Sequence, residues 1–221
     1  MKEKMLNKIS FVLNIFLIIS LSIGIYYMFL SNAYNGVFAT KGLANLKYFT
    51  VLSNLLCFFV AIASLLATVI FHKKLPVVFK LVSASEVGLT FVIIAFFLQP
   101  LYPNMNLYAR GNLWFHLICP LIAMAEFIVI GLNSKKIPFK NTLFSGLLTL
   151  IYGAFYLGNT IINGIGTWPD SNDFYGFLTW GYPIGMIIFA IIVIMSWLIS
   201  VILRLPNVIK NSKRFRKTSE I

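Results

Sequence analysis

Long apolar runs dominate the amino-acid sequence, separated by short stretches that contain polar residues, glycine or proline. Several of these runs exceed the roughly 18 apolar residues that a membrane-spanning helix needs. We therefore predict an all-α, polytopic integral membrane protein, in which a bundle of six transmembrane helices forms a single domain over residues 1–221. The predicted helices cover about residues 9–30, 47–72, 76–98, 112–132, 141–164 and 176–203, and a basic tail covers 204–221.

The composition excludes a soluble domain and several kinds of site. Of the 221 residues, 59% are hydrophobic and 11% are charged, which is more apolar surface than a soluble domain of this length can bury. The net charge of +12 does not indicate nucleic-acid binding, because the basic residues lie in short loops and tails between the apolar runs. Cys57 and Cys119 lie within apolar runs, so we expect no disulfide framework, and no residue spacing indicates a metal or an organic cofactor.

The basic residues are distributed unevenly between the two sides of the predicted bundle. Fifteen of the 18 Lys and Arg residues fall in the N-terminal segment, the second and fourth connections with their flanks, or the tail. The other side carries three, at Lys41, Lys47 and Arg110. Because cytoplasmic loops carry an excess of Lys and Arg, we predict that both termini are cytoplasmic.

With this orientation, polar residues of four predicted helices fall in the outer half of the membrane. At about 1.5 Å per residue, Thr50 and His116 each lie about one turn from the outer surface. Tyr156, Asn159 and Tyr182 lie in the same half, whereas the inner half of the helices is almost wholly apolar. The pattern is typical of a polar pocket that opens toward the outer leaflet, although hydrogen bonds that hold helices together give the same pattern.

Two acidic residues lie deeper in the predicted helices. Glu86 lies near the middle of the third helix, and Glu126 lies past the middle of the fourth. A carboxylate at this depth must face the interior, pair with another group or be protonated, so each is a candidate functional residue. The alternative for Glu86 is a structural carboxyl group, hydrogen-bonded to Ser83, Ser85 or Thr90.

Thr50 and His116 are the candidate catalytic residues. A hydroxyl group near an imidazole is the smallest nucleophile–base pair for acyl transfer, since a histidine side chain accepts the hydroxyl proton. Pro120 cannot donate a backbone hydrogen bond to the carbonyl of His116, which allows the fourth helix to bend there. Asn54, Asn159 or Tyr156 would supply donors to the oxyanion. The predicted supporting pocket comprises Ser53, Asn54, Glu86, Glu126, Tyr156, Asn159 and Tyr182.

These residues resemble motifs of the androgen-induced family of intramembrane hydrolases, most closely those of its bacterial relatives. The second helix begins with Tyr48-Phe49-Thr50 and continues to Ser53-Asn54, which is similar to the pattern YFT-x-x-SN of those relatives. The fourth helix is similar to the pattern H-x-x-x-P followed by Asp, and here reads His116, Pro120 and Glu126. The segment FYGFLTWGYP, residues 174–183, resembles the last loop of the bacterial group.

The resemblance implies an activity, a substrate class and a location. Eukaryotic members hydrolyse fatty acid esters of hydroxy fatty acids with a threonine nucleophile and a histidine inside the membrane. Carried over to this chain, Thr50 is the nucleophile and His116 is the base. Two departures are that Glu126 replaces the usual Asp and that Asn54 lies one position later than the Asn of the eukaryotic motif. The implied substrate is a membrane lipid with an acyl ester, and the implied location is a bacterial plasma membrane.

Three functions fit the sequence and predict different experimental results. A lipid-ester hydrolase or acyltransferase takes its substrate sideways from the outer leaflet and loses all activity without Thr50. A small proton- or cation-coupled transporter depends on Glu86 and Glu126 instead, although the chain shows no internal repeat. A non-catalytic membrane scaffold uses the polar layer for packing, so that Thr50→Ala lowers its stability without removing an activity.

Overall fold

The computed structural model of the chain describes residues 2–31, 42–167 and 171–219 and confirms the predicted all-α class. Its described residues contain helices, turns and irregular segments but no strand. Six helices are long and apolar enough to cross a membrane, which makes the chain an integral membrane protein. These spans are Glu3–Leu30, Phe49–Val69, Val77–Leu101, Gly111–Leu132, Phe139–Asn163 and Tyr182–Ser212.

Most spans are built from more than one kind of helix. The first consists of α1 (Lys2–Ile25) and η1 (Tyr26–Leu30), and the 3-10 helix η2 (Gly42–Lys47) precedes the second, α2 (Phe49–Val69). The third consists of α3 (Val77–Ile93), η3 (Ile94–Leu98) and α4 (Gln99–Leu101). The fourth consists of α5 (Gly111–Leu113), η4 (Trp114–Ile118) and α6 (Cys119–Leu132). The last two are α7 (Leu143–Asn163), preceded by η5 (Phe139–Thr142), and α8 (Tyr182–Ser219).

Three spans contain a π-helical turn, in η1, η3 and η4. Pro100 and Pro120 each follow a π-helical turn within two residues. Proline has no N–H to donate to the carbonyl four residues earlier in the helix. The helix forms a wider, π-helical turn where that hydrogen bond is missing. At His116, where the sequence allows a bend, the fourth span has the π-helical turn η4.

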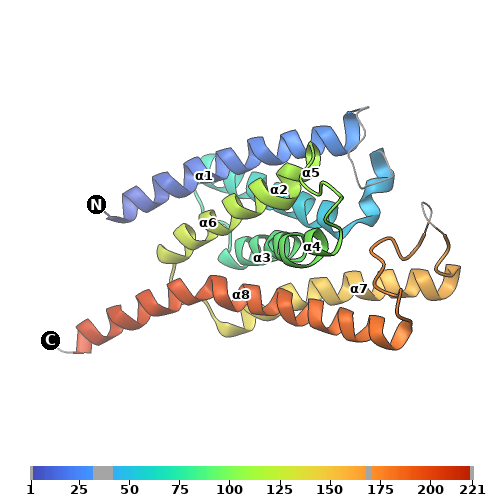
Figure 1. Cartoon of the computed structure of the whole chain (residues 1–221). Helices are drawn as coiled ribbons and strands as arrows, with labels where there is room; N and C mark the ends of the chain where they lie inside the picture. The colour runs from blue at the N-terminus through green and yellow to red at the C-terminus, as the bar shows by residue number, and fades with distance from the viewer. Residues whose placement is uncertain (1, 32–41, 168–170, 220–221) are drawn as a thin grey trace.

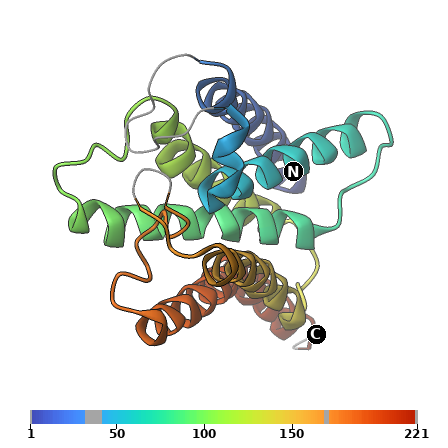
Figure 2. The same ribbon diagram turned by 90° about the vertical axis from the view of Figure 1, so that its right-hand side faces the viewer.

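The third span is the centre of the bundle. It packs against α2 and α6 on one side and against α7 and α8 on the other, and it crosses the bundle between these groups (Figure 2). In this span 67% of the most apolar stretch is buried, against 44% or less in every other span. Side chains of α1, α2, α3, η4 and α6 form most of the largest apolar core, which includes Leu17, Leu21, Phe115 and Phe127.

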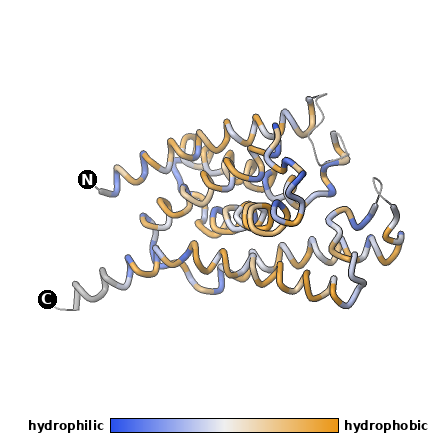
Figure 3. The backbone as a smooth tube through the Cα atoms, viewed as in Figure 1, coloured by the Kyte–Doolittle hydropathy of each residue, from blue (hydrophilic) through white to orange (hydrophobic). Residues whose placement is uncertain are grey.

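Both termini lie at one end of the bundle, which we call the termini end (Figure 1). The connections at residues 70–76 and 133–138 lie at the same end, and the segments 42–47, 102–110 and 171–181 lie at the opposite end, which we call the far end. Hydrophobic residues cover most of the length of the helices between these ends (Figure 3). The cytoplasmic location of the termini stays a prediction, and Lys41 lies outside the described residues.

The ends of the first and last helices differ from the prediction. α1 begins at Lys2 rather than at residue 9, because residues 2–8, although mostly polar, are mostly good helix formers. α8 begins at Tyr182 rather than at residue 176, because Gly176 and Gly181 have φ angles of +69° and +84°. Pro183 then occupies the first turn of α8, a favoured position for proline.

The predicted tail is mostly helical, since α8 continues through Pro206 to Ser219. The side chain of Asn207 holds this part of the helix against the connection between α6 and η5. It donates to the carbonyl of Gly131 at 2.8 Å and accepts the N–H of Ile137 at 2.9 Å. These bonds to main-chain groups stabilise the helix beyond the proline.

Candidate active site

Thr50 lies in the first turn of α2, two residues after the N-cap residue Tyr48. Backbone N–H groups in a first helical turn have no acceptor within the helix, and the helix dipole makes this end partially positive. Thr50 is buried, with 4% of its surface exposed. Its position therefore favours negative charge on, or close to, the threonine hydroxyl.

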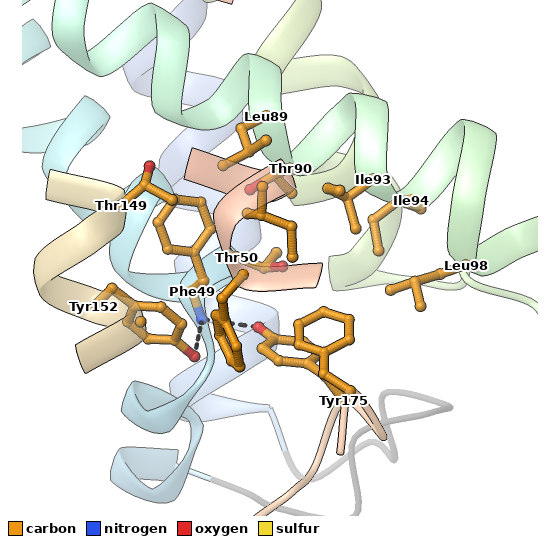
Figure 4. Close-up of a pocket in the computed structure, with 14 residues that line it drawn as sticks. Phe49, Thr50, Leu89, Thr90, Ile93, Ile94, Leu98, Thr149, Tyr152 and Tyr175 are labelled. Atoms are coloured by element: carbon orange, nitrogen blue, oxygen red, sulfur yellow. Dashed lines mark hydrogen bonds between the residues drawn. The ribbon is translucent and has the colours of Figure 1, made fainter. Parts of the chain in front are cut away.

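Two tyrosine hydroxyl groups accept hydrogen bonds from this helix end. The N–H of Phe49 donates to Tyr152 at 3.1 Å and to Tyr175 at 2.9 Å (Figure 4). Tyr152 in turn donates to the carbonyl of Lys47 at 2.8 Å. Burial raises the pKa of Tyr175 to about 12, although hydrogen bonding to Tyr152, then to Phe49 and Thr50, favours the charged form of its hydroxyl. Tyr175 is therefore a protonated hydroxyl group next to Thr50 at neutral pH.

Ser53 and Asn54 brace the turn that carries Thr50. Ser53 donates to the carbonyl of Thr50 at 3.1 Å, and its oxygen is also 3.1 Å from the Thr90 hydroxyl on α3. The side-chain amide of Asn54 donates to the carbonyl of Thr50 at 2.8 Å and to that of Phe115 at 3.1 Å. Asn54 therefore joins the turn of Thr50 to the residue before His116. Both of its N–H groups are used in this way, so we assign Asn54 a positioning role rather than that of an oxyanion donor.

His116 lies in η4 and is fully buried. Its Nδ1 atom is 2.5 Å from the carbonyl oxygen of Leu107. Because a carbonyl oxygen can only accept a hydrogen bond, Nδ1 carries the hydrogen, and a neutral imidazole then has its lone pair on Nε2. A general base held by a hydrogen bond from its other ring nitrogen is the arrangement found in acyl-transfer enzymes.

One cavity of about 610 Å³ at the far end of the bundle is lined by both Thr50 and His116. Its walls come from the start of α2, η3, η4 and the segments 102–107 and 171–179. The lining is mixed, with apolar residues such as Ile94 and Leu98 and polar residues such as Asp173 and Thr179. We call this space the site cavity; both residues that the sequence predicts to be catalytic line it.

A second, smaller space of about 50 Å³ adjoins the site cavity at Thr50. We call it the apolar pocket, because side chains such as Leu89, Ile93, Phe189 and Ile192 form most of its lining. Figure 4 shows Thr50 among these residues, with α3 side chains along one side and Tyr152 along another. Thr50 lines both spaces, so a group bound at its hydroxyl adjoins a compartment of mixed lining and an apolar compartment.

The other predicted polar residues of the far end hold the 171–181 segment over the site cavity rather than lining it. Tyr156 donates to Asp173 at 2.5 Å, and Asp173 also accepts the N–H of Leu178 at 2.9 Å. Asn159 donates to the side chain of Asn172 at 3.0 Å, at an exposed position. Tyr182 donates to the carbonyl of Thr160 at 3.2 Å.

The two predicted acidic residues lie away from the site cavity and from each other. Glu86 is 1% exposed and accepts hydrogen bonds from Thr149 of α7 at 2.9 Å and from Ser196 of α8 at 3.2 Å. These donors come from other helices, not from the neighbouring residues on α3 that the sequence suggested. Glu86 therefore joins the central helix to both helices on one side of the bundle.

Glu126 forms a buried ion pair with Lys80 near the termini end. Lys80 Nζ is 2.8 Å from Oε2 and 2.9 Å from Oε1 of Glu126, and it also donates to Asn14 Oδ1 at 2.5 Å. On the sequence alone, Lys80 is only one of the basic residues that flank the second connection. The structure buries it instead, with 4% of its surface exposed.

Tyr152, Asp173 and Tyr175 are site residues that sequence reasoning did not select. Tyr175 lies in the segment that resembles the last loop of the bacterial family, which is a signal that could have identified it. Tyr152 lies four residues before Tyr156 and so shares its helix face. Because the two tyrosines share a face, which of them meets the start of α2 depends on how α7 is placed along the bundle, and the sequence does not determine this.

Comparison of the chain with protein-family models, with curated proteins and with solved structures finds no match. No matched relative therefore supplies residue roles. The similarity to the androgen-induced family stays a prediction based on short motifs. The roles of Thr50 and His116 are inferred from their positions in the site cavity.

Proposed function

We propose that the chain is an intramembrane lipid-ester hydrolase or acyltransferase with Thr50 as nucleophile and His116 as base. The observation that carries this proposal is that both residues line one cavity, with Thr50 at a helix N-terminus and His116 in the tautomer of a base. Membership in the bacterial branch of the androgen-induced family, and a bacterial plasma membrane as its location, belong to the same proposal.

The proposed reaction proceeds in two steps. Thr50 Oγ attacks the acyl carbon of the ester while its proton passes to Nε2 of His116. The bond between the acyl carbon and the alcohol oxygen breaks, and the alcohol leaves with that proton. Water, or a second alcohol in an acyltransferase, then attacks the acyl-threonine; His116 takes its proton and returns it to Thr50 Oγ as the acyl group leaves.

Two groups beside Thr50 are suited to stabilise the tetrahedral oxyanion. The first is the backbone N–H of Thr50 at the positive end of α2. The second is the hydroxyl of Tyr175, which accepts the N–H of Phe49 and can donate its own hydrogen. Its raised pKa keeps that hydrogen in place at neutral pH.

The two compartments match the two parts of an ester. The apolar pocket suits the part of the acyl chain next to the carbonyl, and the larger, mixed site cavity suits the alcohol part. The chain lies within a membrane, so the substrate class that reaches this site most directly is a membrane lipid with an acyl ester. The proposal requires no metal or organic cofactor.

Labelling with a fluorophosphonate probe tests the proposal, because the probe reacts with activated hydroxyl groups. We expect labelling of the purified wild type and its loss in Thr50→Ala and in His116→Gln. Thr179→Ala is the matched control, since Thr179 has a hydroxyl in the same cavity that donates to the carbonyl of Gly176. Ser53→Ala is a second control, because it removes the hydrogen bond from Ser53 to the carbonyl of Thr50 and keeps the Thr50 hydroxyl.

The same experiment separates the hydrolase from the transporter. A transporter that uses Glu86 or Glu126 has no reason to react with the probe, whereas a hydrolase keeps its labelling in Glu86→Gln if the variant folds. Folded wild type without labelling, or labelling that survives Thr50→Ala, would show that the proposal is wrong. Proton-coupled transport by wild type and Glu86→Gln would then be the next measurement.

A further inference from the structure

A second large cavity lies at the termini end of the bundle, away from the proposed active site. Its volume is about 690 Å³, and its walls come from α1, α2, α3 and α6 together with the connections at 72–75 and 133–135. We call it the basic vestibule. It shares no lining residue with the site cavity, so a ligand here does not depend on the proposed reaction.

The charge of the vestibule lining is strongly positive. Among the described residues, its charged side chains are those of Lys73, Lys74, Lys80, Lys135 and Glu126, so positive charges exceed negative ones by three. Glu126 binds Lys80 through both carboxylate oxygens. This ion pair forms the floor of the vestibule and has no net charge. The excess charge therefore belongs to the three lysines at the mouth. A cavity with low-dielectric walls focuses such a field and attracts anions.

The backbone that carries two of these lysines is held by the end of α2. His72 adopts a positive φ of 49°, and the N–H of Lys73 donates to the carbonyl of Ala67 at 2.9 Å. The Lys74 ammonium lies 3.4 Å from Asn7 Oδ1, which also accepts the amide of Asn133 at 2.6 Å. Asn7 of α1 thus joins Lys74 and Asn133, the residue that follows α6, at the mouth of the vestibule.

Apart from the Lys80–Glu126 pair and the lysines at the mouth, the lining is uncharged and rich in hydrogen-bonding groups. Hydroxyl groups come from Ser10, Ser64 and Thr68, and amides come from Asn7 and Asn14. Such groups suit an oxygen-rich ligand rather than a hydrocarbon chain. The mouth lies where the helices end, which is the depth of lipid headgroups in a membrane.

We infer that the basic vestibule binds a phosphate group, carried either by an anionic lipid headgroup or by a soluble phosphate ester. Lys73, Lys74 and Lys135 surround the phosphate at the mouth. The hydroxyl and amide groups of the lining bind the polyol part of the ligand. The two sources share this chemistry and differ in whether acyl chains are attached.

Titration of the purified protein in detergent, followed by native mass spectrometry, tests this site. The probes are phosphatidylglycerol, phosphatidylcholine and glycerol 3-phosphate. The vestibule variant carries Lys73→Gln, Lys74→Gln and Lys135→Gln. The control variant carries Lys4→Gln, Lys8→Gln and Lys140→Gln, three exposed lysines of the same end that do not line the vestibule.

We expect wild type to bind phosphatidylglycerol at least tenfold more tightly than phosphatidylcholine. The vestibule variant should lose about a hundredfold in affinity for phosphatidylglycerol, because each lysine near an anionic headgroup changes affinity by roughly fivefold. The control variant should stay within about threefold of wild type. Binding of glycerol 3-phosphate without lipid assigns a soluble ligand, whereas binding of phosphatidylglycerol alone assigns a lipid headgroup.

Two results would overturn the inference. One is an equal loss in both variants, which would show a diffuse attraction to the whole basic end rather than a site. The other is a wild type that binds neither glycerol 3-phosphate nor phosphatidylglycerol in preference to phosphatidylcholine. The substituted lysines are exposed, so both variants are expected to fold.

Discussion

Removing one partner of the buried Lys80–Glu126 pair should strongly destabilise the bundle, whereas removing both should not. The pair is almost fully buried, with side-chain exposures of 4% and 2%. All three acceptors around the Lys80 ammonium, two from Glu126 and one from Asn14, lie within 2.9 Å. The amide of Asn14 donates to the carbonyl of Ala61 at 3.0 Å, which turns its oxygen toward Lys80. The network therefore joins α1, α2, α3 and α6.

The expected magnitude follows from the burial of both charges. Lys80→Met leaves the Glu126 carboxylate buried without its donor and should cost about 3–5 kcal/mol in the free energy of unfolding. The double variant, Lys80→Met with Glu126→Leu, removes both charges and keeps the apolar volume. It should recover at least about 3 kcal/mol of that loss, because a buried pair gains little over a well-packed apolar one.

The assay is equilibrium unfolding of the two single variants and the double variant in mixed micelles with increasing fractions of a denaturing detergent. A double-mutant cycle then gives the coupling energy between the two side chains. A cost of under about 1 kcal/mol for Lys80→Met, as for an exposed ion pair, would refute the reasoning. Strictly additive effects of the two single substitutions would refute it as well.

Three further predictions concern the far end of the bundle and its packing. Asn54→Leu removes two hydrogen bonds to buried carbonyls and should cost about 1–3 kcal/mol of stability in the same unfolding assay, with a weaker phosphonate reaction. The pKa of Tyr175 is raised from 10.0 to about 12, so wild type should lose stability as the pH rises through this range, and Tyr175→Phe should lose less, as monitored by thermal unfolding. A Cβ at Gly24 would lie 2.3 Å from the Phe115 ring, so Gly24→Ala should destabilise by about 1–3 kcal/mol, whereas Gly158→Ala, with open space around it, should be neutral or slightly stabilising.

The apolar runs predict the six spans well because a membrane helix is defined by a long local pattern. The helix ends are predicted less well where the limits are not set by hydropathy. α1 extends through the mostly polar residues 2–8. α8 begins only after Gly181, because a left-handed backbone and not a change in hydropathy delays its start. Such limits depend on backbone conformation and helix propensity.

The candidate site, too, is predicted from the sequence only in part. Thr50 and His116 fall at matching depths in the sequence, and both line the site cavity, because depth follows from counting residues along a helix. Which side chains meet around them depends on how the helices are rotated and on where loops fold. Tyr175, in an irregular segment, lies beside Thr50, whereas the predicted Glu126 pairs with Lys80 on the other side of the core.

Locating the phosphonate adduct within the labelled protein tests the central claim most directly. Wild type is labelled, digested and analysed by peptide mass spectrometry, with His116→Gln treated in parallel. The account predicts one adduct, on Thr50, that is absent from the His116→Gln protein. An adduct on Ser53, Thr179 or Cys119 in its place, or an unchanged adduct on Thr50 without His116, would contradict the assignment of an activated threonine.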